Sequence, residues 1–121
     1  MQETTPRDLK DRTYSFARRI IALYRAVPKS TLGQVLGKQV LRSGTSVGAN
    51  YREAFRSRSK AEFVAKMGEC LRELDETEYW LELLVDESIV SQKRMSALLD
   101  ETRQLTAIFV TIIKNARNNP S

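Results

Sequence analysis

The sequence predicts an all-α protein, an up-and-down antiparallel four-helix bundle. Apolar residues recur three and four positions apart over long segments, which is typical of helices with one buried face, and no strand-like alternation competes with this pattern. Pro6 and Pro28 stand where such segments begin or end. The short connections favour antiparallel neighbours. At 121 residues, the chain is expected to form a single domain over residues 1–121.

The first helix is expected over residues 6–27. Thr5 is a suitable N-cap, Pro6 suits the first helical position, and Asp8 places an acid in the first turn. Pro28 ends the helix because the residue before a proline disfavours helical backbone. The predicted core positions are Thr13, Phe16, Ile20, Leu23 and Val27.

The third and fourth helices are expected over residues 60–87 and 92–116. Ser59 and Glu62 match a capping box, and Ser91 is a plausible cap for the fourth helix. Both segments carry heptad-like apolar spacing, which predicts one buried face for each. The core positions are Phe63, Met67, Cys70, Leu74, Thr77, Leu81 and Leu84 in the third helix and Met95, Leu98, Thr102, Leu105, Phe109, Ile112 and Ala116 in the fourth.

The second helix, expected over residues 31–56 with Ser30 as its cap, shows two faces that are apolar or rich in small residues. The face assigned to the core contains Leu32, Val35, Leu36, Gln39, Ser43, Ser46, Val47, Asn50, Glu53 and Ala54. The opposite face contains Leu41, Gly44, Gly48, Tyr51 and Phe55. One four-helix bundle cannot bury both faces. The second face is therefore expected to contact another subunit in a homo-oligomeric ring, helped by Tyr14 and Ile21.

Two features of this helix have a simpler interpretation. Gly44 and Gly48 could serve close packing between helices of the same bundle, because the GxxxG spacing is only weakly diagnostic in water. Asn50 and Glu53 fall on the predicted core face, where an unpaired polar group is costly. They are expected to form a satisfied structural network rather than a catalytic site.

Charge is distributed unevenly along the chain. The net charge is +5, yet residues 1–60 carry thirteen Lys and Arg against four acids, whereas residues 61–121 carry seven against eleven. The cations along the second helix have two explanations. They form a solvated face or pair with the glutamates at 62, 69, 73 and 76. Alternatively, they form a phosphate-binding surface beside Tyr51 and Phe55, whose rings serve for stacking. The candidate nucleic-acid-binding residues are Lys38, Arg42, Arg52, Arg56 and Arg58, with Arg18, Arg25 and Lys29 as a second patch.

Nothing in the sequence indicates catalysis. The chain has no histidine, so it lacks the commonest general base and metal ligand, and Cys70 lies on an apolar face. A Gly-rich phosphate loop and the Glu-x-x-His motifs of di-metal bundles are also missing. We expect no enzymatic activity, no cofactor and no metal. The lone cysteine and the lack of a long apolar run favour a cytoplasmic protein with no membrane partner.

Three segments carry a resemblance to a known family: RSGTSVGANYREA at residues 42–54, SKAEF at 59–63 and LRELDET at 71–77. The chain resembles the small bacterial four-helix bundle proteins encoded within intervening sequences of 23S ribosomal RNA, a family related to the accessory variability determinant of diversity-generating retroelements. The similarity covers nearly the whole chain. Tyr51 and Ala54 depart from the family pattern, which has Ile and Gly at these positions.

The resemblance implies a homopentameric ring with a basic surface that binds nucleic acid or nucleoprotein, and no established enzymatic activity. We therefore predict sequence-tolerant binding of RNA, or of RNA–DNA hybrids, by the candidate arginines and lysines. The alternative is a protein-interaction adaptor that docks a polymerase-like or reverse-transcriptase-like partner.

Overall fold

The computed structural model describes residues 5–119 of the chain, and these residues form four helices and no strand. The helices are α1 (Pro6–Ala26), α2 (Thr31–Phe55), α3 (Lys60–Asp86) and α4 (Gln92–Asn118). Each bound lies within two residues of the sequence prediction, and the all-α, four-helix prediction is confirmed. Within the described residues, none of the helices is both long and apolar enough to span a bilayer.

Local capping explains why the helices begin where they do. The reciprocal capping box forms at α1, where Thr5 accepts from the backbone N–H of Asp8 and the Asp8 carboxylate accepts from the backbone N–H of Thr5. At α3, Ser59 accepts from the backbone N–H of Glu62. Ser30 and Ser91 cap α2 and α4 in the same way. Each cap satisfies a backbone donor that has no partner inside its helix.

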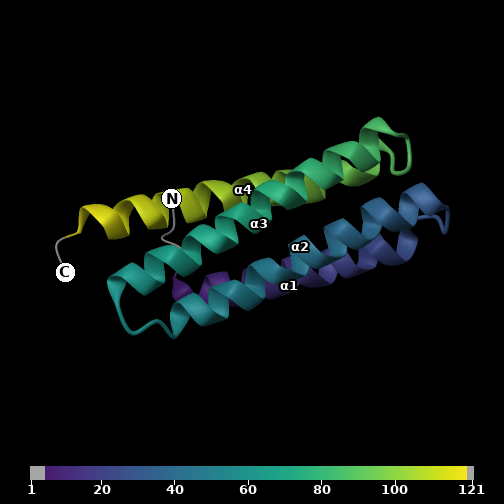
Figure 1. Cartoon of the computed structure of the whole chain (residues 1–121). Helices are drawn as coiled ribbons and strands as arrows, with labels where there is room; N and C mark the ends of the chain where they lie inside the picture. The colour runs from purple at the N-terminus through teal and green to yellow at the C-terminus, as the bar shows by residue number, and fades with distance from the viewer. Residues whose placement is uncertain (1–4, 120–121) are drawn as a thin grey trace.

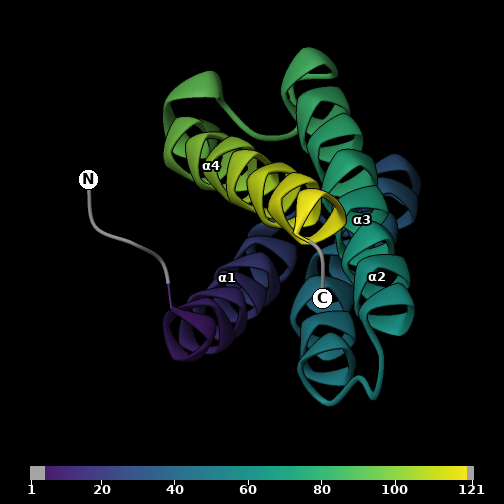
Figure 2. The same cartoon turned by 90° about the vertical axis from the view of Figure 1, so that its left-hand side faces the viewer.

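The four helices run up and down as two antiparallel hairpins (Figure 1). Helix α2 packs against both α1 and α3, and α4 packs against α3. Figure 2, which looks along the bundle, shows α1 and α4 on one side and α2 and α3 on the other. Helix α2 therefore has helical neighbours on two flanks, which decides how its faces are used.

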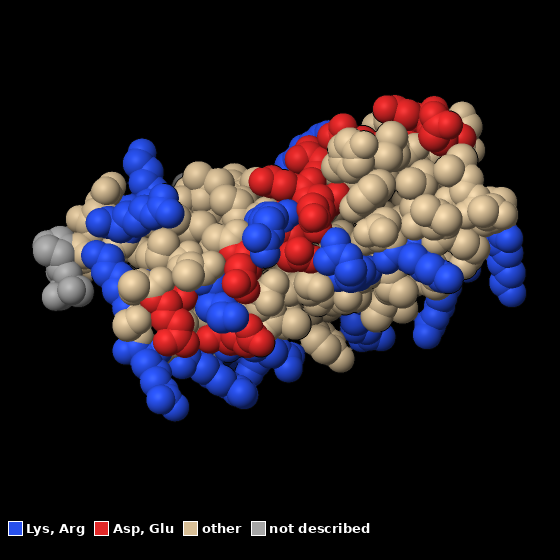
Figure 3. Space-filling model, in the orientation of Figure 1, with Lys and Arg blue, Asp and Glu red and all other residues tan. Residues whose placement is uncertain are grey.

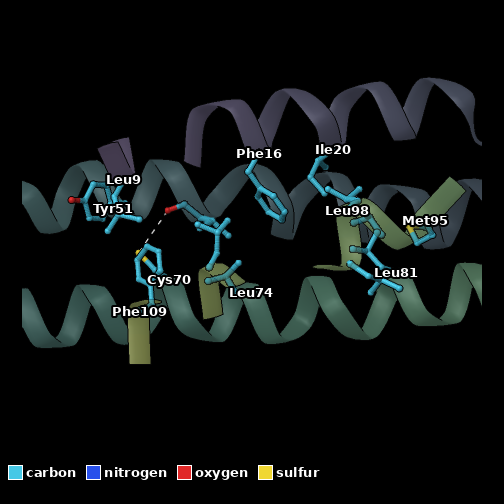
Figure 4. Packing of buried hydrophobic residues seen from close by; sticks show 14 of the residues in the cluster. Leu9, Phe16, Ile20, Tyr51, Cys70, Leu74, Leu81, Met95, Leu98 and Phe109 are labelled. Carbon is cyan, nitrogen blue, oxygen red and sulfur yellow. Dashed lines mark hydrogen bonds between the residues drawn. The ribbon is translucent and has the colours of Figure 1, made fainter. Parts of the chain in front are cut away.

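The core matches most of the predicted positions. Figure 4 shows Tyr51 beside Leu9, Cys70 and Phe109, with Phe16, Leu74 and Leu81 further along the bundle. All predicted core residues of the third and fourth helices are buried except Phe63, Ile112 and Ala116, which are half-buried. In the first helix, Leu23 is the half-buried one. The buried residues that the periodicity missed include Leu9, Val40, Val90, Leu99 and Ile113.

Three residues of the predicted second face of α2 pack inside the chain rather than at a subunit contact, namely Gly44, Gly48 and Tyr51. A Cβ added at Gly44 would lie 2.6 Å from Cγ1 of Ile20, and one at Gly48 would lie 3.3 Å from Oγ1 of Thr13. Tyr51 is buried, and its hydroxyl donates to the carbonyl oxygen of Pro6 at 3.0 Å. The assignment of Gly44, Gly48 and Tyr51 to an oligomer interface is therefore wrong. Close packing against α1 within one bundle accounts for both glycines.

The predicted core face of α2 also needs correction. Four residues of that face are buried as predicted, but the buried arc also includes residues of the opposite face and three that neither face contained. The four are Leu36, Ser43, Val47 and Ala54, the residues of the opposite face are Gly44 and Tyr51, and the remaining three are Gly33, Gly37 and Val40. One edge of this arc meets α1 and the other meets α3. Leu32 and Val35 consequently point outward, with 48% and 56% of their surface exposed. Leu41 is half-buried and packs against the core cluster, whereas Phe55 is exposed.

The polar core predicted at Asn50 and Glu53 lies about two to three turns of α2 away. Glu53 is exposed, and its carboxylate pairs with Nζ of Lys66 at 2.9 Å; Asn50 is half-buried. The buried polar pair is formed by Ser43 and Thr77, whose hydroxyl oxygens are 2.8 Å apart. The structural-core assignment of Glu53 is therefore wrong, because that side of α2 faces solvent beyond the edge of α3.

Candidate nucleic-acid interface

The eight candidate cations are all exposed and all lie on the first two helices or their connections. Arg18 and Arg25 come from α1, Lys29 follows α1, and Lys38 comes from the first half of α2. Arg42 and Arg52 also lie on α2, with Arg56 and Arg58 just after it. Figure 3 shows Lys and Arg side chains projecting along the lower edge of the molecule, below a band rich in Asp and Glu.

Arg42 differs from the other candidates because it is neutralised within the chain. Its guanidinium lies 3.1 Å from the Glu73 carboxylate and 2.7 Å from that of Glu76, both on α3. Glu73 is only 7% exposed. Burial raises the pKa of the Glu73 carboxyl, and the nearby Arg42 guanidinium acts in the opposite direction. The sequence left open whether these cations pair with glutamates or bind phosphate. Arg42 pairs with glutamates of its own subunit.

Three further groups of ion pairs involve acidic residues of α2, α3 and α4. Arg12 of α1 binds Glu101 of α4 through two hydrogen bonds of 2.7 and 2.8 Å. Lys66 bridges Glu53 and Glu69, at 2.9 and 3.5 Å. Arg103 pairs with the carboxylates at 78 and 82. The acidic flank of α3 is therefore largely matched by cations of the same subunit.

The other seven candidates form no ion pair with a carboxylate among residues 5–119. We call this set the unpaired cations: Arg18, Arg25, Lys29, Lys38, Arg52, Arg56 and Arg58. Their positive charge is thus exposed to solvent and is not neutralised by a carboxylate of the described residues. The contrast with Arg42 could not be drawn from spacing, because it depends on how α2 sits against α3.

The register between α1 and α2 places cations of the two helices near one another along their contact. Gly37 packs on Tyr24, Gly44 on Ile20 and Gly48 on Thr13, which fixes an antiparallel alignment. In this register Lys38 lies at about the level of Arg25. Glu53, the acid of α2, pairs on the opposite side with α3. We call the exposed surface along the contact of these two helices the α1–α2 seam, and cations from both helices lie beside it.

Two exposed aromatic residues, Tyr14 and Phe55, lie at one end of the α1–α2 seam. The guanidinium carbon of Arg52 is 5.7 Å from the ring centroid of Tyr14, a cation–π distance. Tyr14 and Phe55 are 56% and 60% exposed. Tyr51 was expected to stack beside the basic stripe but is buried edge-on against Phe109, with ring centroids 5.8 Å apart. The sequence placed Tyr14 away from the core, at a subunit contact, and did not predict its contact with Arg52.

The acidic residues and the thiol of Cys70 are two further features of the described part of the chain. Residues 5–119 hold no group of three or more acids or cysteines placed to bind a metal. Burial raises the pKa of the Cys70 thiol to about 12, so it stays protonated at neutral pH. A shallow groove of about 270 Å³ between α3 and α4 has an apolar floor of Leu71, Val110 and Ile113 and a rim that includes Lys114 and Arg117.

These features define a small four-helix protein whose first two helices and their connections carry the seven unpaired cations. The chain belongs to the 23S rRNA-intervening sequence protein family, which matches residues 8–111. It is also similar to a crystal structure of a protein of unknown function from the S23 ribosomal protein family of Bacteroides thetaiotaomicron VPI-5482. That similarity has 38% identity and a TM-score of 0.85, and it covers 90% of this chain and 97% of the other. Comparison with curated proteins finds no match.

Proposed function

We propose that the chain is a non-enzymatic, homo-oligomeric protein that binds RNA or a nucleoprotein through the α1–α2 seam. The observation that carries the proposal is the set of seven unpaired cations, none of which pairs with a carboxylate among residues 5–119. A surface of this kind attracts a polyanion without needing a specific sequence.

The composition and length of this surface favour phosphate. Arginine predominates over lysine, and its planar fork of donors suits two-point contact with phosphate oxygens. At about 1.5 Å per residue, the run from Lys38 to Arg56 extends over roughly 27 Å of α2. That length is enough to follow several phosphates along a strand. The name of the family, which refers to an intervening sequence in 23S rRNA, is consistent with an RNA ligand.

The proposed oligomer is a pentameric ring. With Gly44, Gly48 and Tyr51 used against α1, we assign the subunit contact to apolar side chains that remain outside the bundle. Leu32 and Val35 of α2 are about half exposed. Exposed apolar side chains of this size are suited to a protein contact.

Light scattering after gel filtration tests the assembly. The wild-type chain is expected to elute as a particle of five copies, and Leu32→Glu/Val35→Glu should lower the mass because it places charges in the contact. The matched variant Ala97→Glu/Ala107→Glu, at exposed positions of α4, should leave the mass unchanged. A wild type with the mass of one chain at micromolar concentration contradicts the ring.

RNA titration at several salt concentrations tests the binding function. Each phosphate contact contributes a log–log slope of about −0.7 to −0.9, because neutralising a phosphate releases counterions. Arg52→Glu/Arg56→Glu should lower affinity at least tenfold and make the slope shallower by roughly two contacts. The control Lys93→Glu/Arg94→Glu makes the same charge change in the first turn of α4, where acids suit the helix dipole. It should retain most of the affinity.

The rival function predicts a different outcome. An adaptor for a polymerase-like or reverse-transcriptase-like partner, the role that the resemblance to retroelement accessory proteins implies, touches nucleic acid little. Weak RNA binding that is unaffected by Arg52→Glu/Arg56→Glu, or reduced equally by both charge variants, would favour the adaptor over the RNA-binding protein.

A further inference from the structure

We propose that the α1–α2 seam binds single-stranded nucleic acid, with Tyr14 and Phe55 as stacking surfaces for unpaired bases. This inference rests on the proposed nucleic-acid binding and goes further by naming the form of the ligand. It depends on the aromatic side chains around Arg52 rather than on the total positive charge.

The exposed aromatic residues are concentrated at the end of the α1–α2 seam that contains Arg52. Among residues 5–119, three aromatic side chains are more than half exposed: Tyr14, Phe55 and Tyr79. Two of these three lie beside one arginine, since Arg52 contacts the Tyr14 ring and Phe55 follows Arg52 by three residues on the helix. Residues three apart on a helix are neighbours on its surface. The cation and both rings therefore form one continuous patch.

The fold does not need these rings for its own core. Aromatic side chains such as Phe16, Tyr51 and Phe109 are buried and supply the packing of the bundle. Tyr14 and Phe55 instead keep more than half of their surface in solvent, where large aromatic rings gain little. Arg52 forms no ion pair with a described carboxylate, so its charge is free to meet a phosphate beside the rings.

Exposed rings next to cations discriminate between strand forms. In a duplex, base faces are covered by the neighbouring base pairs, so aromatic side chains reach only the edges of bases and the backbone. An unpaired strand offers base faces, and stacking on aromatic side chains adds affinity with little sequence preference. The unpaired cations would serve both forms, whereas Tyr14 and Phe55 would strengthen only single-strand binding.

The test compares one RNA sequence of about 20 nucleotides as a labelled single strand and as a perfect duplex, titrated by fluorescence anisotropy. The variant Tyr14→Ala/Phe55→Ala leaves all charges in place. Tyr14→Phe/Phe55→Tyr keeps both rings. Tyr79→Ala removes an equally exposed ring from α3, away from the α1–α2 seam. A single strand carrying 2-aminopurine, which loses fluorescence when it stacks, reports the contact directly.

We expect Tyr14→Ala/Phe55→Ala to lose on the order of tenfold or more in single-strand affinity and most of the 2-aminopurine quenching at saturation. Its duplex affinity, salt slope and mass by light scattering should stay at wild-type values, and the other two variants should bind normally. Equal losses on both RNA forms, no loss on the single strand, or a reduced oligomer mass would overturn the stacking role. In those cases wild-type, salt-sensitive binding would still support the proposed function. If wild type binds neither RNA form, both proposals fail.

Discussion

Replacing Gly44 with alanine should lower the free energy of unfolding by about 1–3 kcal/mol, although alanine is the better helix former by about 1 kcal/mol. The added Cβ would lie 2.6 Å from Cγ1 of Ile20 and 2.9 Å from its Cγ2 and Cδ1. Ile20 is fully buried, so it cannot move aside without disturbing the core. Urea unfolding followed by circular dichroism measures the change.

Gly68 provides the matched control. It lies within α3, and a Cβ added there meets no atom within 4 Å. Gly68→Ala should therefore raise the free energy of unfolding by about 0.5–1 kcal/mol, because it removes backbone entropy from the unfolded chain. If Gly44→Ala stabilises the protein as Gly68→Ala does, the close approach of α1 and α2 at this point is not what the structure indicates.

Replacing Arg42 with methionine should cost about 1–3 kcal/mol at neutral pH, because it leaves the Glu73 carboxylate buried without its cation. Burial already raises the pKa of Glu73, and losing Arg42 should raise it further. The folded state then binds a proton more readily than the unfolded state. The deficit of the variant should therefore be largest well above that pKa and shrink as the carboxyl becomes protonated.

Urea unfolding of wild type and Arg42→Met at about pH 7.5 and about pH 5 measures this effect. Arg103→Met is the control, since Arg103 is about as exposed as Arg42 but pairs with the less buried Glu78 and Glu82. It should change stability far less than Arg42→Met does, because its pairs are exposed to solvent. Because Arg42 is neutralised within the fold, its loss should alter RNA affinity far less than Arg52→Glu/Arg56→Glu. A large loss of RNA affinity with unchanged stability would return Arg42 to the binding surface.

Helix number and bounds could be predicted because they depend on local signals. Caps such as Thr5 and Ser59, and Pro28 after the first helix, act within a few residues of the chain. Which side of a helix is buried depends on where its neighbours lie. For α1, α3 and α4, a single apolar stripe in the sequence predicted which side is buried.

Helix α2 was harder because it has neighbours on two flanks. A helical wheel of its sequence gives two separate faces, but the structure has one wide buried arc centred between them. Glycine carries no side chain to indicate what it faces, so Gly44 and Gly48 suited a subunit contact as well as α1. The outward placement of Leu32 and Val35 follows once α1 and α3 are in position.

The candidate site could be predicted in part. Exposure of the cations followed from the helical pattern and the uneven charge. Pairing of Arg42 with Glu73 and Glu76 depends on the register of α2 against α3, which sequence spacing does not fix. The contact between Arg52 and Tyr14 depends in the same way on the register of α2 against α1.

The position of Cys70 has a consequence for measuring motion in this protein. Its Sγ lies 3.6 Å from the carbonyl oxygen of Val47, in the seam between α2 and α3, and it is the single thiol of the chain. A thiol reagent can reach it only when the two hairpins separate or the chain unfolds. The rate of alkylation in native buffer therefore reports how often the seam opens, with no label or substitution needed.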